Sequence, residues 1–259
     1  MTSLNLEDMR VLIVGGTSGV GLATARQLAE AGTRRFALVG RNRERGDAAR
    51  QAVLAVAPDA TVTFIAGDAG RYCEAERVVA ATEAALGGID LLVNSTSTGY
   101  CPDLFFRTPP EDMATLLGEL VNAPMNMCRA VIDRMRASKR GVIVNIASDA
   151  AKVPTPGETI VGAAMAAIVM FSRTLALEAK RDGIRVHALT PSLIAGTATA
   201  QNVTQSGFSA KLFASAAAQA HLGVAEPDDI AATIVFLASP GAARMTGQVI
   251  SINGGISVA

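Results

Sequence analysis

A glycine-rich turn is the first place in the chain where residue types and their spacing suggest a chemistry. The sequence GGTSGVG, residues 15–21, follows the apolar run RVLIV and precedes a segment with helical spacing of apolar residues. Glycines let such a turn approach a phosphate closely, and the positive end of the following helix stabilises the phosphate charge. A tight turn without a ligand is the alternative. We expect a dinucleotide pyrophosphate to bind at Gly15, Thr17, Ser18, Gly19, Val20 and Gly21.

The residue about twenty positions beyond such glycines distinguishes the two nicotinamide cofactors. An acidic side chain there binds the ribose 2′-hydroxyl of NAD, whereas an arginine suits the 2′-phosphate of NADP. Here the second apolar run ends at Gly40 and is followed by Arg41, with Arg43 and Arg45 nearby. The sequence therefore favours NADP over NAD as the cofactor.

Charge, cysteine content and hydropathy argue against several other classes of function. Lys plus Arg and Asp plus Glu both number 23, and this balance suggests neither nucleic acid nor a membrane surface as a partner. The three cysteines lie far apart without metal-ligand spacing, which is typical of reduced thiols in a cytoplasmic protein without a metal site. The longest apolar run, residues 160–171, is too short to cross a bilayer and predicts a buried helix. We expect a cytoplasmic protein that acts on a small-molecule substrate.

Short apolar runs alternate with helical patterns along the whole chain. The runs lack polar alternation, as strands buried on both faces of a parallel sheet do. They are RVLIVGG, RFALVGR, TVTFIAGD, IDLLVNS, GVIVNIAS, IRVHALTP and QVISING. The order predicts an α/β, single-domain Rossmann fold over residues 1–259, with a doubly wound parallel seven-stranded sheet and helices on both faces. Ligands of such sheets bind beyond the carboxyl ends of the strands.

Further motifs make the chain similar to the short-chain dehydrogenase/reductase family over nearly its whole length. Besides VGGTSGVG, the matching segments are GDA at 67–69, LLVN at 91–94, IVNIAS ending at Ser148, IRVHALTPSLI at 184–194, FLASP at 236–240 and TGQVISINGG at 246–255. The resemblance implies a Rossmann fold and an oxidoreductase that uses a nicotinamide cofactor on carbonyl or alcohol substrates.

The resemblance also implies cofactor contacts outside the glycine turn. Asp68 and Ala69 would flank the adenine, and Asn94 would support the cofactor near the fourth strand. Pro191 and Ile194 would border the nicotinamide. Purely structural roles remain open, because Asn94 could brace the sheet and Pro191 could end a strand.

The resemblance breaks down at the catalytic residues. The family uses a Ser, a Tyr and a Lys, assisted by an Asn, and the Ser and Asn are matched by Ser148 and Asn122. Val161 stands at the position of the Tyr, and Met165 stands at the position of the Lys. Valine cannot exchange a proton, and methionine has no charge with which to lower a phenol pKa. Loss of general acid–base catalysis alone typically costs about 10²–10⁴-fold in rate.

Several other side chains could replace the missing acid, although surface or packing roles are the default for each. They are Tyr100, Asp149, Lys152, Glu158, His187 and His221. Two hypotheses therefore stand. The chain is an NADP-dependent oxidoreductase with atypical or weak activity, or it is a catalytically inactive subunit with a structural or regulatory role beside an active partner.

Two long helical segments, 109–140 and 158–181, lie where the family usually associates. The first is expected to begin with a capping box at TPPE, residues 108–111, with Pro109 at the first helical position. We expect a homodimer or homotetramer, or a hetero-oligomer with an active relative.

Overall fold

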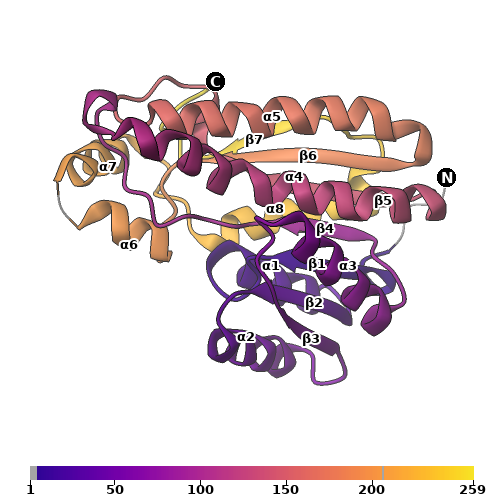
Figure 1. Cartoon of the computed structure of the whole chain (residues 1–259). Coiled ribbons are helices and arrows are strands. Elements are labelled where there is room, and N and C mark those ends of the chain that lie inside the picture. The colour runs from indigo at the N-terminus through magenta and orange to yellow at the C-terminus, as the bar shows by residue number, and fades with distance from the viewer. Residues whose placement is uncertain (1–4, 206) are drawn as a thin grey trace.

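A single parallel sheet organises the chain in this computed structural model, which describes residues 5–205 and 207–259 (Figure 1). The strand order is β3-β2-β1-β4-β5-β6-β7. The strands are β1 (Arg10–Val14), β2 (Arg35–Gly40), β3 (Thr61–Ala66), β4 (Leu91–Asn94), β5 (Gly141–Ile146), β6 (Ile184–Pro191) and β7 (Val249–Ile252). The order reverses between β1 and β4, which makes that point the switch of a doubly wound sheet. The predicted fold class is confirmed.

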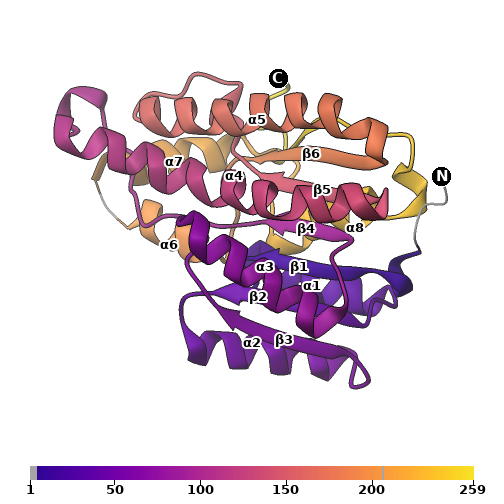
Figure 2. The same ribbon diagram turned by 45° about the vertical axis from the view of Figure 1, so that its right-hand side comes forward.

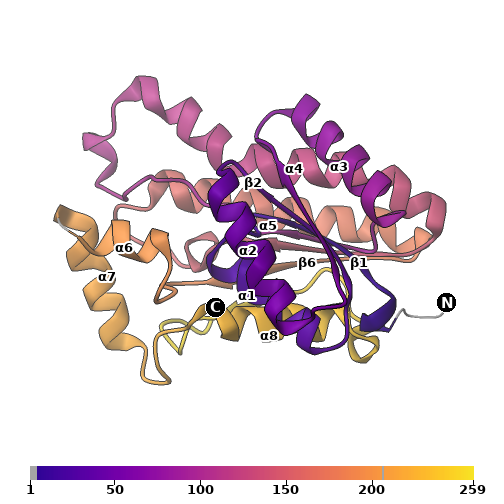
Figure 3. The same cartoon turned by 90° about the horizontal axis from the view of Figure 1, so that it is seen from below.

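Helices cover both faces of the sheet (Figures 1 and 2). One face carries α1 (Gly19–Glu30), α2 (Arg43–Val56) and α8 (Pro227–Ala238), whereas the other carries α3 (Tyr72–Leu86), α4 (Met113–Ser138) and α5 (Thr159–Ala179). Figures 1 and 3 show α6 (Ala198–Thr204) and α7 (Gly207–Gln219) together at the end of the molecule away from the N-terminus.

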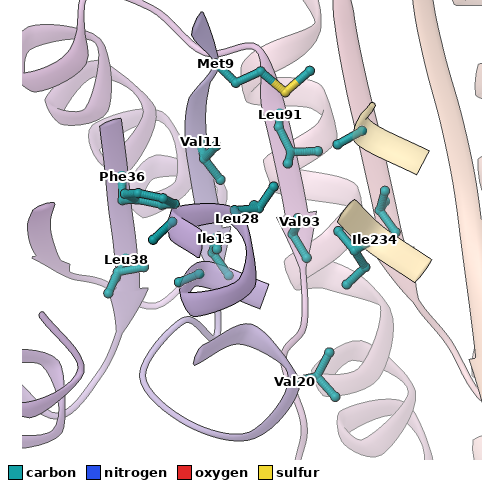
Figure 4. Close-up of a cluster of buried hydrophobic side chains, with 14 of the residues drawn as sticks. Met9, Val11, Ile13, Val20, Leu28, Phe36, Leu38, Leu91, Val93 and Ile234 are labelled. Atoms are coloured by element: carbon teal, nitrogen blue, oxygen red, sulfur yellow. The ribbon is translucent and has the colours of Figure 1, made fainter. Parts of the chain in front are cut away.

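The first strand shows why its sequence is an unbroken apolar run. Val11 and Ile13 point into the core beneath α1 and α8, where Figure 4 shows them beside Leu28. Leu12 and Val14 point into the opposite core beneath α3 and α4. All four are nearly inaccessible to solvent. Because successive side chains of a strand alternate between faces, each of these positions in β1 faces a covered side of the sheet, where an apolar side chain needs no hydrogen-bond partner.

The predicted start of α4 is wrong. No side-chain cap forms, and a 3-10 turn at Pro110–Asp112 precedes the helix, which begins at Met113. The cause is the second proline of the TPPE motif. A residue before proline avoids the α region, and Pro109 accordingly has φ −59° and ψ 131°. The capping box would need Pro109 in helical conformation, which Pro110 prevents.

Helix α5 is less buried than the apolar run 160–171 predicts. One side packs on β6 and α4, but Met170 and Leu177 are 61% and 63% exposed. By length and composition alone the segment Thr159–Asp182 could cross a membrane, with mean hydropathy 1.9 and 39% of its most apolar window buried. One such helix is weak evidence for a span. The expectation of a fully buried helix is wrong on the exposed side.

Candidate active site

The carboxyl ends of the strands open into a cavity of about 1190 Å³. One end is lined by the glycine turn and by the residues that follow β2 and β3. The other end lies between α4, the start of α5, and the α6–α7 pair. The cavity therefore sits at the switch point, where doubly wound sheets bind their ligands.

The glycine turn is packed so tightly that side chains are excluded. Gly15 and Gly19 have φ of +80° and +49°, in the left-handed region that favours glycine. A Cβ on Gly15 would lie 2.2 Å from the carbonyl oxygen of Ser95, and a Cβ on Gly21 would lie 2.3 Å from that of Gly15. Ser18 precedes α1 without a side-chain bond to its first turn, so the amides of that turn are left for another acceptor. Thr17 and Val20 also line the cavity.

Cationic side chains gather beside the end of β2. Arg41 and Arg45 are exposed and line the cavity, whereas Arg43 does not line it. The side chain of Asn42 caps α2 by accepting a hydrogen bond from the Arg45 amide at 2.9 Å. This cap sets where α2 begins, and Arg45 in the first turn of α2 lines the cavity together with Arg41. The pair suits an anionic group at this end of the cavity.

The loop after β3 is fixed to α4 by a residue that the sequence analysis did not single out. Asn126 donates from Nδ2 to the carbonyl oxygens of Ala69 at 3.1 Å and Gly70 at 3.0 Å. Asp68 is exposed, accepts a hydrogen bond from the Gly70 amide at 3.1 Å, and lines the cavity with Ala69. An asparagine inside an amphipathic helix carries no signal that would have revealed this contact.

Asn94 braces the sheet and keeps one polar atom free. Its Nδ2 donates to Oδ1 of Asn145 at 2.8 Å, and Asn145 donates to Oγ of Ser172 at 2.9 Å. Ser172 in turn donates to the carbonyl oxygen of Ile168 at 2.7 Å. Asn94 is buried and lines the cavity, and within the described chain its Oδ1 has no hydrogen-bond partner. A buried acceptor of this kind fits a ligand hydroxyl, such as one on a ribose.

The far end of the cavity combines Ser148 with apolar side chains. Ser148 lies at the start of a short 3-10 turn, and its Oγ accepts a hydrogen bond from the Ala150 amide at 3.3 Å. Val161 and Met165 line the cavity and belong to one apolar cluster with Leu120 of α4. Asn122 also lines the cavity, but it is exposed, and its Nδ2 lies beside Gly118 of its own helix.

Two further predicted residues follow β6. Pro191 is the last residue of the strand and is buried, and Ile194 forms an isolated parallel bridge with Ala225. Both line the cavity. Apart from Gly21, which packs against Gly15 and does not line the cavity, the predicted site residues meet at one cavity, from segments that lie far apart in the sequence.

Only some of the candidate replacements for the missing acid line the cavity. Tyr100, Asp149 and Glu158 line the cavity, whereas Lys152 is occupied with the Ser251 hydroxyl and the Ala259 carbonyl oxygen. His221 is exposed and outside the cavity lining.

His187 is fully buried in β6 and also lies outside the cavity lining. Burial, together with the neighbouring Arg185 cation, lowers the pKa of His187 to about 4. Its burial agrees with the packing role expected by default, although its Nδ1 has no hydrogen-bond partner in the described structure.

Glu158 is the cavity carboxyl whose protonation is most perturbed. Burial raises the pKa of Glu158 to about 6, against the effect of a hydrogen bond with Thr155. The nearby Asp149 carboxylate raises it further. Glu158 immediately precedes α5, one turn before Val161.

Strand order, glycine turn and cavity position define a doubly wound Rossmann-type protein. A family model described as enoyl-(acyl carrier protein) reductase matches residues 14–257. The chain belongs to the short-chain dehydrogenase/reductase family of oxidoreductases, as its motifs predicted.

Relatives with known structures or activities cover almost the whole chain. A 3-oxoacyl-[acyl-carrier-protein] reductase of Chlamydia muridarum is 32% identical over 99% of this chain and 100% of its own length. The structure of a 3-ketoacyl-(acyl-carrier-protein) reductase from Brucella melitensis complexed with NADH is 26% identical, with a TM-score of 0.86 and coverage of 98% of this chain and 100% of that chain. An NADPH-bound short-chain oxidoreductase from Pseudomonas aeruginosa PAO1, described as containing an atypical catalytic center, is 28% identical, with a TM-score of 0.88 and coverage of 98% and 99%.

Proposed function

We propose that this chain is a single-domain, NADP(H)-binding oxidoreductase with atypical or weak activity on carbonyl or alcohol groups. The observation that carries the proposal is one cavity that joins an uncapped glycine turn and two arginines to Ser148. The relatives that bind NADPH and NADH support nicotinamide binding in this fold.

The residues of the cavity fit such a cofactor along its length. The amides of the glycine turn and the positive end of α1 would hold the pyrophosphate. Arg41 and Arg45 would pair with the 2′-phosphate that distinguishes NADP from NAD. Asp68 and Ala69 would flank the adenine, and Oδ1 of Asn94 would accept a hydrogen bond from the ribose.

The substrate would meet the nicotinamide between Pro191, Ile194 and Ser148. The chemistry that bound NADP(H) would supply there is the gain or loss of a hydride. The Ser148 hydroxyl already accepts from the Ala150 amide, so its proton is free to orient a substrate oxygen. Val161 and Met165, at the family's Tyr and Lys positions, offer neither a proton nor a cation, and the activity expected on carbonyls is weak for that reason. Asn122 stays a proposed assisting residue.

Calorimetric binding of NADPH and NADH tests the proposal first. We expect NADPH to bind more tightly than NADH, and Arg41→Ala to weaken NADPH by about tenfold, as the loss of one charged phosphate contact would. Arg43→Ala is the matched control, because Arg43 lies two residues away and outside the cavity. Absence of binding of either nucleotide would refute the proposal.

A second candidate, a catalytically inactive subunit beside an active partner, draws support from α5. Its exposed Met170 and Leu177 lie on one of the two helices through which the family associates. This candidate predicts that Val161→Tyr with Met165→Lys gives no carbonyl reduction by NADPH. A gain of reduction in that double variant would favour the oxidoreductase.

A further inference from the structure

Charge is divided between the two ends of the cavity. The cationic lining residues, Arg41, Arg45 and Arg71, all lie at the end near β2 and β3. The substrate lobe is the remainder, lined by α4, α5, α6, α7 and the loops after β4, β5 and β6. Among the described residues that line this lobe there is no Lys, Arg or His, but three carboxylates are present: Glu119, Asp149 and Glu158.

Glu158 immediately precedes α5 and continues the stripe of that helix that faces the lobe. Glu158, Val161, Met165 and Ile168 all line the cavity, and their spacing of three and four residues places them on one helix face. A long helical side chain covers the turn that precedes its own Cα. A long side chain at position 161 would therefore cover the turn at Glu158, and valine is too short to do so. The only titratable group of this stripe is left beside the cavity.

Asp149 brings a second carboxylate that is short of partners. It is 6% exposed, and its Oδ2 accepts hydrogen bonds from Asn253 Nδ2 at 3.1 Å and Ser257 Oγ at 2.5 Å. Its Oδ1 is buried and has no hydrogen-bond partner within the described chain. Lys152, the nearest cation in sequence, is held by the Ser251 hydroxyl and the Ala259 carbonyl oxygen. A buried carboxylate that has one oxygen without a partner and no cation beside it is stabilised by binding a cation.

The rest of the lobe is uncharged, with apolar walls beside neutral polar residues such as Tyr100, Thr115 and Gln219. Its walls include Val153, Pro154, Met165, Leu193, Leu212 and Phe213. This combination suits a ligand with an apolar body and a positive group, and it disfavours a negatively charged one.

The missing acid points to the same class of ligand. A carbonyl oxygen needs a proton when its carbon receives a hydride, and Val161 cannot supply one. An iminium group, C=N⁺, is already positive and needs no proton. A lysine at position 165 would repel such a cation, whereas methionine does not.

We propose that the substrate lobe binds an apolar iminium cation, with Glu158 and Asp149 as its counter-charges, and that this cation is reduced with NADPH. The inference rests on the proposed binding of NADP(H). The iminium carbon accepts a hydride from NADPH, forming a C–H bond. The π electron pair of C=N⁺ moves onto nitrogen, and the products are a neutral amine and NADP⁺, with no proton transferred in the step.

The test compares two probes of similar bicyclic shape, the N-methyl-dihydroisoquinolinium cation and the neutral ketone β-tetralone. NADPH consumption is followed after subtraction of the rate without protein. We expect the cation to react about a hundredfold faster or more, because only the ketone suffers from the missing acid. The double variant Val161→Tyr with Met165→Lys should lose this preference.

A binding measurement isolates the counter-charges from turnover. N-methyl-tetrahydroisoquinoline, protonated at neutral pH, is titrated calorimetrically into the protein with and without NADP⁺. Glu158→Gln should weaken its binding by about tenfold, or about 1.4 kcal/mol, without changing NADPH affinity. Glu178→Gln is the matched control, because Glu178 is an exposed carboxylate of α5 that lies outside the cavity.

The outcomes distinguish failure of the iminium proposal from failure of the cofactor proposal. If NADPH binds but the cation neither binds nor reacts faster than the ketone, the iminium proposal is overturned and the cofactor proposal stands. The iminium proposal would also be overturned if the ketone reacted faster than the cation, with a pH dependence near 6 that Glu158→Gln removes. Glu158 would then be a proton donor to carbonyls. Failure of NADPH to bind would overturn both.

Discussion

The close approach at Gly15 leads to a quantitative prediction about the cofactor turn. Gly15→Ala places a Cβ 2.2 Å from the Ser95 carbonyl oxygen, at a φ of +80°. Gly87→Ala provides a control, because Gly87 has a φ of +78° and its added Cβ meets nothing within 4 Å. The two variants therefore share the conformational strain of a left-handed alanine, and only the first has a backbone clash.

The shared strain costs about 1–2 kcal/mol. The clash requires the turn or the loop after β4 to shift, since real Cβ atoms essentially never approach another atom closer than 3.0 Å. Overpacking of this kind typically adds about 1–3 kcal/mol. We expect Gly15→Ala to lower the free energy of unfolding by about 2–5 kcal/mol and Gly87→Ala by about 1–2 kcal/mol.

Urea unfolding followed by circular dichroism measures both variants, and NADPH calorimetry reports the shape of the turn. Gly15→Ala should also weaken NADPH by more than tenfold, because a shifted turn no longer aims its amides at the pyrophosphate. Gly87 caps α3 away from the cavity, so its variant should bind NADPH normally. Equal stability losses in the two variants would refute the packing argument. Unchanged NADPH affinity in Gly15→Ala would refute the assignment of the turn to the pyrophosphate.

Three further predictions concern stability, positioning and reactivity. Burial raises the pKa of Asp90, but the hydrogen bonds and charge of Arg10 outweigh this effect and leave that pKa lowered. The stabilisation by the pair is therefore present above the ordinary carboxyl pKa and is lost as the pH falls through the lowered pKa. Asp90→Asn should flatten the fall in the free energy of unfolding below about pH 4. Asn126→Ala should weaken NADPH by about tenfold in calorimetry, because two hydrogen bonds to the loop after β3 are lost, and unchanged affinity would contradict that role. Burial raises the pKa of the Cys128 thiol to about 12, so mass spectrometry after mild alkylation should find it unmodified and the two exposed cysteines modified; equal labelling would show that the core opens.

The seven strands and the doubly wound parallel sheet were predictable because each strand carries its own signal. Both faces of the sheet are covered, so every strand is an apolar run, and alternation with helical patterns then fixes parallel crossovers. The glycine turn was predictable for a similar reason, since its spacing between strand and helix is local. The start of α4 was missed because the four-residue motif TPPE was weighed without the restriction that Pro110 puts on Pro109.

The substrate lobe was much harder to predict than the glycine turn. Glu158, Asp149 and Phe213 come from separate segments, and only the folded chain shows that they share a lobe of the cavity whose described lining has no cationic side chain. Asn126 and Asn145 were missed because a polar residue in a helix or strand looks the same whether it faces water or holds a neighbouring loop. The roles of the site residues remain predictions for experiment.

The hydrogen bonds from Asn94 to α5 have a direction, and that direction determines what the cavity offers a ligand. Ser172 has one hydroxyl hydrogen, which it donates to the Ile168 carbonyl oxygen, so it can only accept from Asn145. The Oδ1 atom of Asn145 must then face Asn94, whose Nδ2 donates a hydrogen bond to it. The Ile168 carbonyl oxygen in α5 thus determines the orientation of the Asn94 amide. An amide flip of Asn94 would break the hydrogen bond to Asn145, so Asn94 presents its oxygen, an acceptor, to the cavity.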